Sequence, residues 1–385
     1  MSRTFIPFDD SYRVPASVKV SRGVRTSDTL FLCGQMDLNA DGQAQNVDDL
    51  SAQTRRAMGL LNDVIEKAKM RPSNAVQLHV FYRGDVDEVS YRREILDVFP
   101  AYKDALVVLT PVDSYPSEGA AVEIDAIVVN HDERAIVEDE SGRVVGARRG
   151  EWVFVEGHST ARVLEAQIAE VAARVHRVLQ GLRADINDVC RVNAYYSSDL
   201  SDDMLARAES QLAAMFVDSR PTYHAAVLPK PLPDGQFLRV EVIGLRGTDG
   251  DRLESTDANG ALDWDWPNGL PYSKALRRGN FVFLSAQLPV DKSGALCHPS
   301  DIAGQTHLVM SHMGKALNAL GADFSHMTKV NAYFEGNNDL EDWRINVGIR
   351  SDYYVAPGPA STGIEVKRCS TDGALITADC FAVVD

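Results

Sequence analysis

Residues 270–385 contain the stretch that decides the fold. It opens with PYSKALRRGNFVFLSAQLPVD (271–291), continues with SDIAGQTHLVMSHMGKALNALGADFSHMTKVNAYF (300–334), and ends with GPASTGIEV (358–366) and LITADCFAVV (375–384). The spacing of the apolar residues predicts two strands, a long amphipathic helix, a third strand, a second helix and two final strands.

The same order of motifs occurs twice earlier in the chain. FLCGQ, AQTRRAMGLL, VQLHVFY and VEIDAI follow one another in the first copy, and FVEGH, AQIAEVAARV, VCRVNAYY and VEVIGL in the second. Two landmarks give matching spacings. Gln53 and Gln167 lie 114 positions apart and Asp125 and Glu241 116, while Gln167 to Gln305 and Glu241 to Asp379 are both 138 positions. Self-similarity at such periods indicates a repeated structural unit.

We therefore predict three repeats, at residues 15–130, 140–246 and 270–385. A Gly-, Asp- and Asn-rich linker at 247–269 joins the second repeat to the third. The last strand of each repeat is an almost continuous apolar run, which is typical of strands covered on both faces. One face must meet the helices, and three repeats in one chain can bury the other face against each other.

Composition limits the function classes. The 385 residues carry a net charge of −16, which opposes binding to nucleic acid, and 45% of them are hydrophobic. Five cysteines occur without CxxC spacing, and no apolar run reaches the roughly 18 residues that span a membrane. The first residues lack the pattern of a signal peptide. We expect a cytoplasmic protein without nucleic-acid or membrane partners.

These motifs resemble those of the YjgF/YER057c/UK114 family, also called RidA, three times over. PYSKALRRGNFVFLSAQLPVD is similar to its opening, GQTHLVMSHMGKAL to its first helix and TADCFAV to its last strand. The resemblance implies an α+β fold related to chorismate mutase. Family members are typically homotrimers with ligand pockets between subunits, so the chain is expected to be an intramolecular pseudo-trimer around a central β-barrel-like core. Its three clefts would be inequivalent.

The resemblance also implies an Arg that clamps the substrate carboxylate, a task that suits the two-pronged guanidinium. The matching positions hold Leu106 or Val107, Tyr223 and Ser361, so no repeat has this Arg. The substrate therefore either lacks an α-carboxylate or is held by a cation elsewhere. Candidates for such a cation are Arg22, Lys274 and Arg368.

A second implied feature is an acidic residue on the last strand, matched by Asp125, Glu241 and Asp379. Such a carboxylate becomes a general base if desolvation raises its pKa. The predicted catalytic residues are Glu241, Asp379 and Glu365. The alternative is a structural carboxylate paired to an arginine such as Arg239, and this alternative is favoured for Asp125.

The third repeat matches further family features, Tyr272 in PYS and Asn346 on the second helix. We expect its polar residues to line one cleft together with an adjoining repeat: Tyr272, Ser285, Gln287, Asn346, Ser361 and Glu365. Alternatively, Tyr272 and Gln287 only satisfy backbone groups.

The second repeat offers another set of substrate-binding candidates, His158, Tyr223 and His224. An acid–base pair would form if the sheet brought a histidine next to Glu241. The alternative is that both histidines are hydrogen-bonded structural groups.

No zinc-ligand spacing, phosphate-binding loop or GxGxxG motif is present, so a site without metal or cofactor is expected. The leading hypothesis is a small-molecule hydrolase or deaminase acting on an imine, enamine or related C–N bond. The alternatives are a non-enzymatic metabolite-binding or chaperone-like protein, and a chorismatase-like hydrolase. We expect a small-molecule ligand and either a monomer or a further homo-oligomer.

Overall fold

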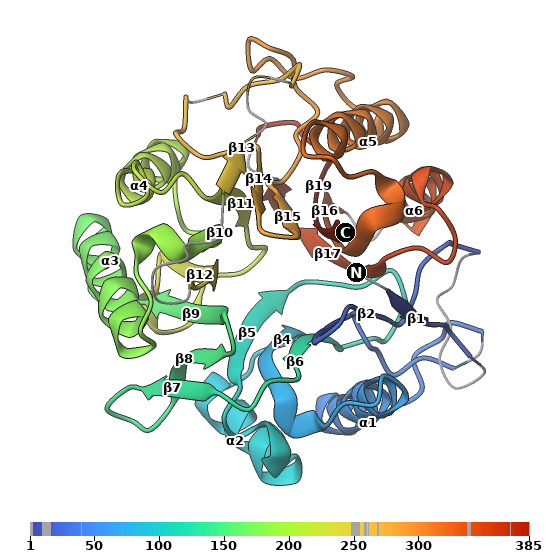
Figure 1. The fold of residues 1–385 in the computed structure, drawn as a ribbon, viewed down its shortest axis with the longest axis vertical. Coiled ribbons are helices and arrows are strands. Elements are labelled where there is room, and N and C mark those ends of the chain that lie inside the picture. Colours follow the sequence, from blue (N-terminus) through green and yellow to red (C-terminus); the bar gives the residue numbers. More distant parts are fainter. Residues whose placement is uncertain are drawn as a thin grey trace.

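The computed structural model describes residues 3–9, 17–39, 41–247, 255–257, 260, 262–267, 269–336, 340–369 and 371–384. Three sheets surround a common centre, and each is covered on its outer side by two helices (Figure 1). We call the parts of the chain that form β1–β6, β7–β12 and β13–β19 the first, second and third units.

The first sheet has the strand order β1-β2-β3-β6-β4-β5. Its strands are β1 (Thr4–Ile6), β2 (Gly23–Arg25), β3 (Thr29–Leu32), β4 (Ala75–Arg83), β5 (Leu106–Val112) and β6 (Val122–Val129). Its helices are α1 (Leu50–Lys67) and α2 (Glu88–Val98).

The second sheet has the order β18-β11-β10-β12-β9-β8-β7. Its own strands are β7 (Arg134–Glu138), β8 (Val144–Arg149), β9 (Trp152–His158), β10 (Val189–Tyr196), β11 (Thr222–Val227) and β12 (Leu238–Leu245). Its helices are α3 (Leu164–Gly181) and α4 (Asp202–Ala214). Strand β18 (Arg368–Cys369) comes from the third unit and pairs with β11.

The third sheet has the order β13-β14-β15-β19-β16-β17. Its strands are β13 (Ser255–Asp257), β14 (Ala275–Arg278), β15 (Phe281–Leu284), β16 (Met327–Glu335), β17 (Ala360–Val366) and β19 (Ile376–Val383). Its helices are α5 (Ile302–Ala319) and α6 (Leu340–Tyr353).

The predicted α+β fold with repeated units is confirmed. Within the described strands the sheets remain three separate sheets and do not close into one hydrogen-bonded barrel. Strands β1, β7 and β13 each add an edge strand outside the predicted repeats, and β13 lies within the predicted linker. The division into domains at residues 15–130, 140–246 and 270–385 stays a prediction.

The repeated helix glutamine has the same structural role in each unit. Nε2 of Gln53, Gln167 and Gln305 donates to the carbonyl of a glycine before the last strand, at 2.8, 2.8 and 3.0 Å. Each Oε1 accepts from a backbone amide in that segment, at 2.7 Å in all three units. Because these groups are buried, the glutamine ties the start of the long helix to the last strand of its unit.

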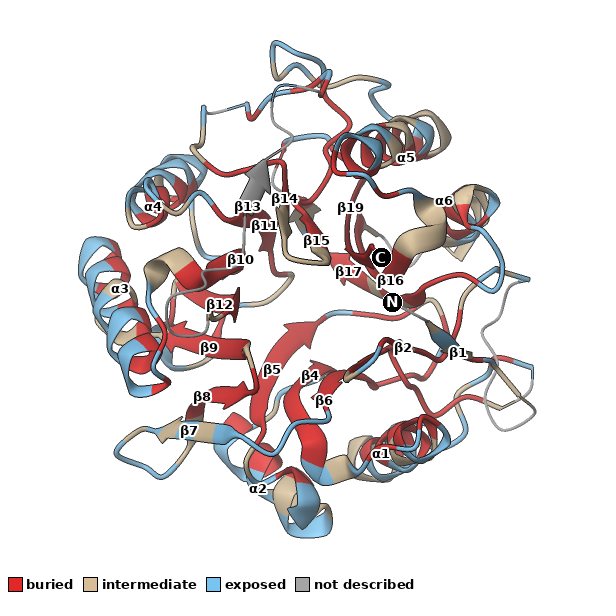
Figure 2. Cartoon of the chain, viewed as in Figure 1, coloured by how far each residue is buried: buried red, intermediate tan, exposed pale blue. Residues whose placement is uncertain are grey.

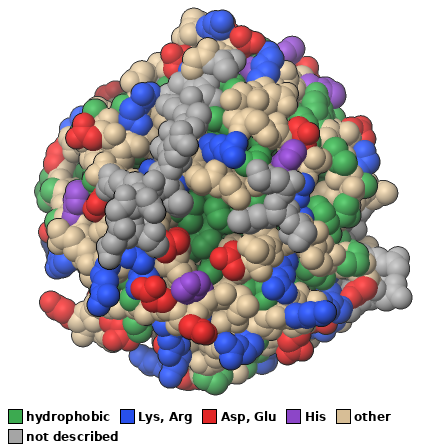
Figure 3. Space-filling view, in the orientation of Figure 1, with side chains coloured by type: hydrophobic (Ala, Val, Ile, Leu, Met, Phe, Trp, Pro, Cys, Tyr) green, Lys and Arg blue, Asp and Glu red, His purple; other side chains and the backbone are tan. Residues whose placement is uncertain are grey.

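Alternation along each last strand produces two different faces. On β6, Ile124, Ala126 and Val128 join the apolar cluster beneath the helices, whereas Ile127 and Val129 face the common centre. The central cluster takes aromatic side chains from all three units: Phe31, Trp152, Phe154, Phe283 and Phe381. Figure 2 shows the resulting pattern of buried strands and helices exposed on their outer sides. Figure 3 shows acidic and basic side chains intermixed on one face of the molecule.

The units meet at three seams. At the seam between the third and first units (seam 3/1), Ser21 N–H donates to Pro359 O at 2.9 Å. At seam 2/3, Ser273 N–H donates in the same way to Pro221 O at 3.0 Å. At seam 1/2, Trp152 Nε1 donates to Thr29 Oγ1 at 3.1 Å. The ring of units is thus joined at each contact.

Candidate active site

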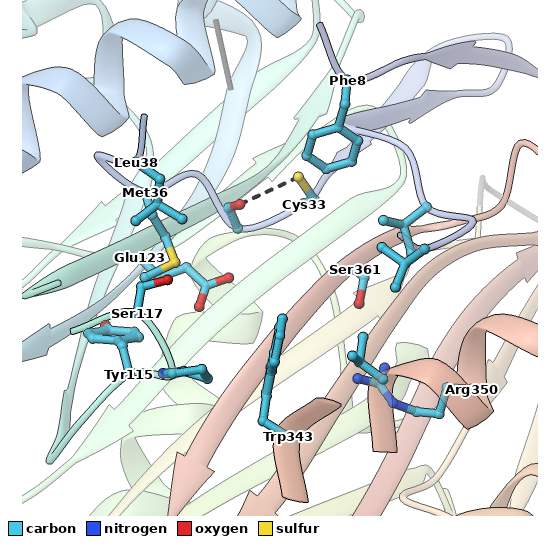
Figure 4. Close-up of a pocket in the computed structure, with 16 residues that line it drawn as sticks. Phe8, Cys33, Met36, Leu38, Tyr115, Ser117, Glu123, Trp343, Arg350 and Ser361 are labelled. Carbon is cyan, nitrogen blue, oxygen red and sulfur yellow. Dashed lines mark hydrogen bonds between the residues drawn. The ribbon is translucent and has the colours of Figure 1, made fainter. Parts of the chain in front are cut away.

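A cavity of about 80 Å³ lies at seam 3/1. The first unit supplies Glu123 and the third unit Arg350 and Trp343, and Figure 4 shows them entering from different sides. Other lining side chains are mostly apolar or small: Phe8, Val18, Val20, Cys33, Met36, Leu38, Tyr115, Pro116, Ser117, Val347 and Ser361.

Glu123, on β6, provides the carboxyl group of the cavity. Burial raises its pKa to about 8, the nearby Asp125 adds to this, and Lys329 and the Gly363 amide act in the opposite direction. The glycine at position 34 makes room for it, because a Cβ there would lie 1.6 Å from Glu123 Oε1. The cavity therefore contains a carboxylic acid that holds its proton near neutral pH.

Arg350, on α6, provides the cation. Its side chain is only 2% exposed. Nε and Nη2 donate to Asn346 Oδ1 at 3.3 and 3.2 Å, and Nη1 lies 3.4 Å from the Tyr354 hydroxyl. Both of these partners are neutral.

Cys33 also borders the cavity. Burial raises the pKa of its thiol to about 12, so it stays protonated at neutral pH and is a weak nucleophile. The neighbouring Tyr115 donates its hydroxyl to Phe81 O at 2.7 Å and presents its ring as part of the wall.

Seam 1/2 is filled by charged side chains. Arg239 occupies the position of Glu123, since each lies two residues before the inner carboxylate of its last strand. Each also pairs with the equivalent residue of the neighbouring antiparallel strand, Tyr195 on β10 and Phe81 on β4. Arg239 Nη2 lies 3.0 Å from Glu88 Oε2 and its Nε 3.5 Å from Glu156 Oε1. Arg143 pairs with Glu156 as well. Burial opposes ionisation of Glu156, but Arg143 and Arg239 outweigh it and hold its pKa well below the usual range.

Seam 2/3 is filled by aromatic rings. Tyr223 stacks on Tyr272 with ring centres 4.1 Å apart, and its hydroxyl lies 3.2 Å from that of Tyr196. Trp266, from the predicted linker, packs against Tyr223 at 5.9 Å. Ser285 Oγ accepts from the Tyr223 amide at 2.8 Å. The ring stack occupies the space that corresponds to the cavity at seam 3/1.

The polar candidates of the third repeat do not lie together in one cleft. Tyr272, Ser285 and Gln287 lie at seam 2/3, where Gln287 Oε1 accepts from Trp264 Nε1 at 3.1 Å. Ser361 lines the cavity at seam 3/1, and Asn346 is buried beside it. One unit presents its opening strands to the preceding unit and its second helix to the following one, so its polar residues divide between two seams.

Glu365 lies on β17 in the third unit, beside Gly336, where an added Cβ would meet its carboxyl carbon at 2.6 Å. It is 9% exposed and is not among the residues lining the cavity.

The predicted cleft carboxylates Glu241 and Asp379 lie in a central polar cluster instead. Arg191 holds Asp379 with Nη1 at 2.7 Å from Oδ1, and Lys329 Nζ lies 2.7 Å from Asp125 Oδ2. The cluster surrounds a cavity of about 20 Å³, too small for a substrate. Neither predicted residue lines the cavity at seam 3/1, because this part of the last strand lies at the common centre. Their catalytic role stays a prediction.

The two predicted histidines contact side chains other than Glu241. His158 Nε2 lies 3.3 Å from Arg174, and burial lowers its pKa to about 4. His224 stacks on Tyr333 at 3.6 Å, and burial holds its pKa well below the usual value. The histidine beside Glu241 is His79, with Nε2 3.3 Å from Oε1.

The alternative cations have other partners. Arg22 pairs with Asp63 at 2.9 Å, Lys274 with Asp265 at 3.2 Å, and Arg368 with Asp202 at 2.6 Å.

Sequence reasoning missed Glu123 and Arg350. The signal for Glu123 was present, because it lies two residues before Asp125 and therefore on the same strand face. Arg350 lies four residues after Asn346, hence on the same side of the helix.

Within the described part of the chain, no group of three His, Cys, Asp or Glu side chains is arranged to hold a metal ion. None of the described helices has the length and apolar character needed to cross a membrane.

Comparisons with known proteins agree with the repeated architecture. The chain matches the family described as endoribonuclease L-PSP at residues 12–130 and again at 267–384. A RutC family protein of Pyrococcus abyssi is 32% identical over 102 residues, covering 26% of this chain and 78% of the relative. The human 2-iminobutanoate/2-iminopropanoate deaminase is 27% identical over 116 residues, covering 28% of this chain and 85% of the relative.

A solved chorismatase structure is similar over 81% of this chain and 93% of its own, with a TM-score of 0.55 and 16% identity. At this identity the likeness shows the fold alone.

Proposed function

The chain belongs to the endoribonuclease L-PSP family, also called the RidA or YjgF/YER057c/UK114 family, and on this premise we propose that it hydrolyses an imine, enamine or related C–N bond at seam 3/1. The observation that carries the proposal is Glu123, a buried acid with a pKa of about 8 in a cavity formed by two units. Relatives named as deaminases support the reaction class.

Glu123 suits both proton transfers of imine hydrolysis. In its protonated form it donates a proton to the imine nitrogen, which gives an iminium ion. The resulting carboxylate takes a proton from water as the water oxygen bonds to the carbon. The carbinolamine then releases ammonia and leaves a carbonyl group, as its hydroxyl proton passes to nitrogen. An enamine joins this sequence when Glu123 protonates its carbon.

The register of the sheets supports a substrate held without the family's usual clamp. Val107, Tyr223 and Ser361 are equivalent, because each lies beside the matching residue of the parallel strand, Leu78, Val192 and Val330. None of the three is an Arg, and in the first unit the equivalent residue is Val107 and not Leu106.

The test is ammonia release from a panel of imines and enamines. Glu123→Gln is expected to lower kcat by about 10²- to 10⁴-fold, the usual contribution of general acid–base catalysis. Glu66→Gln, the same change at an exposed position of α1, is the matched control.

Wild-type rates in Glu123→Gln would contradict the assignment. Loss in Glu241→Gln or Asp379→Asn alone would move the chemistry to the central cluster. Saturable binding without any turnover would favour the metabolite-binding alternative.

A further inference from the structure

Seven arginines of the described chain are buried, and four of them are at most 2% exposed: Arg22, Arg191, Arg239 and Arg350. Three of them contact carboxylates: Arg22 with Asp63, Arg191 with Asp379, and Arg239 with Glu88. The fourth, Arg350, has only Asn346 and Tyr354 as hydrogen-bond partners among the described residues. A buried guanidinium without a counter-charge is costly. Arg92 and Arg149 are also buried and donate only to backbone carbonyls, but Arg350 in addition borders the cavity at seam 3/1, which gives space for an anion beside it.

The fixed position of Arg350 suits ligand binding. Asn346 and Tyr354 are themselves buried, and Asn346 Nδ2 donates back to the Asp342 carbonyl at 3.2 Å. The three hydrogen bonds of Arg350 leave two of the five guanidinium N–H groups, one on each terminal nitrogen. Two N–H groups are what a carboxylate uses in a bidentate pair.

The other walls of the cavity indicate which kind of group carries the anion in the ligand. Tyr115 and Trp343 contribute aromatic walls, and Met36 and Leu38 add apolar surface. Among the described contacts no ion pair joins Arg350 to Glu123, so the cavity separates the cation from the acid.

We propose that Arg350 binds the carboxylate of the substrate, an apolar or aromatic imino or enamino acid whose C–N bond lies toward Glu123. The cation is thus supplied by helix α6 and not by the strand position held by Ser361. This inference deepens the proposed function and rests on it for the C–N bond, but carboxylate binding can be measured without turnover.

The experiment is calorimetric titration of the full chain with phenylacetate and with its uncharged analogue phenylacetamide. Phenylacetate is expected to bind the wild-type protein at least tenfold more tightly than the amide. Arg350→Gln should remove this preference, and Arg350→Lys should keep part of it, since lysine retains the charge but not the planar fork. Arg344→Gln, an exposed arginine of the same helix, is the matched control and should bind as the wild type does.

Equal affinity for the two ligands in the wild-type protein would overturn the proposal, as would undiminished phenylacetate binding in Arg350→Gln or no binding at millimolar concentration. Thermal unfolding of each variant separates loss of binding from loss of folding. Carboxylate binding without ammonia release from any imine would leave Arg350 as an anion-binding residue and remove only the proposed reaction.

Discussion

Glu123 and Asp125 lie two residues apart on one face of β6, but their surroundings differ. Lys329 and Thr362 each contact Asp125 at 2.7 Å. Glu123 has a backbone amide and apolar walls instead, and its pKa rises to about 8. One strand therefore carries a structural carboxylate at the common centre and the proposed proton donor at the seam. The groups that the third unit places beside each carboxyl account for the difference.

The pKa of Glu123 predicts the pH dependence of activity. If Glu123 starts the reaction as an acid, kcat/KM should be constant below about pH 7 and fall as pH rises through about 8, where the proton is lost from the free enzyme. A pH–rate profile from pH 5.5 to 9.5 measures this, with a substrate that does not titrate in the range. A rate that increases through pH 8 would show that the ionised form starts the reaction.

Two buried arginines, Arg191 and Arg350, are expected to contribute unequally to stability. Arg191→Met should lower the free energy of unfolding by about 3–5 kcal/mol, because it leaves Asp379 buried without its cation. Arg350→Met should lower the free energy of unfolding by no more than about 1 kcal/mol, because removal of a charge without a counter-ion offsets the loss of the donors to the buried Asn346 Oδ1. Urea denaturation at pH 7 compares the two. Equal losses in both variants would mean that Arg350 is structural.

At the scale of elements, the long helix of each unit is fastened at its start. The glutamines of α1, α3 and α5 each bridge from the helix to the segment before the last strand. The same last strand carries the inner residues of its unit, including Glu123 in the first. In the first unit, Gln53 therefore links the position of α1 to the position of β6 and of Glu123.

Gln305→Ala is expected to cost about 1–3 kcal/mol, because it leaves the Leu375 amide and the Gly373 carbonyl without their partner. Gln305→Glu should also destabilise, since a carboxylate accepts from the amide but cannot donate to the carbonyls. Chemical denaturation provides the measurement, and Gln180→Ala, an exposed change on α3, is the control. A Gln305→Ala protein as stable as the control would show that water replaces the bridge without loss.

At the scale of the molecule, the central polar cluster connects the units in a cycle. Arg191 of the second unit holds Asp379 of the third, and Lys329 of the third holds Asp125 of the first. The contact between the first and second units completes the cycle. There Gln77 Nε2 donates to Glu241 Oε2 at 3.3 Å, and this pair lacks the Arg or Lys cation of the other two contacts. Burial, with Glu156 and Asp125 nearby, raises the pKa of Glu241 to about 8.

Glu241 should therefore make stability depend on pH. Its pKa is about 8 when folded and 4.5 ordinarily, so between these values the folded state holds a proton that the unfolded state releases. The free energy of unfolding consequently falls as pH rises across this window. Glu241→Gln removes that contribution, and its stability relative to the wild type should increase from pH 5 to pH 8.5 by a few kcal/mol at most. Urea titrations at both values measure it, and a constant difference would contradict the assigned pKa.

The fold could be predicted from the sequence because the same motifs recur in each unit. The apolar pattern within one unit is enough to predict its helices and strands. The site did not follow, since its residues depend on which unit stands next. Tyr272 and Ser361 belong to one repeat but face different neighbours, and Glu123, Arg239 and Thr377 are equivalent positions with unrelated side chains. Strand alternation was sufficient to group Glu123 with Asp125, but not to show which of them reaches a cavity.

The filled seams have a consequence for ligand stoichiometry. Ion pairs occupy seam 1/2 and stacked tyrosines occupy seam 2/3, while seam 3/1 holds the cavity with Glu123 and Arg350. A titration of the chain should accordingly end at one equivalent of ligand per polypeptide, with a single affinity and no cooperativity within the ring. The packed side chains at seams 1/2 and 2/3 then hold the units together. Substitutions there should lower the free energy of unfolding and leave the proposed turnover at seam 3/1 unchanged.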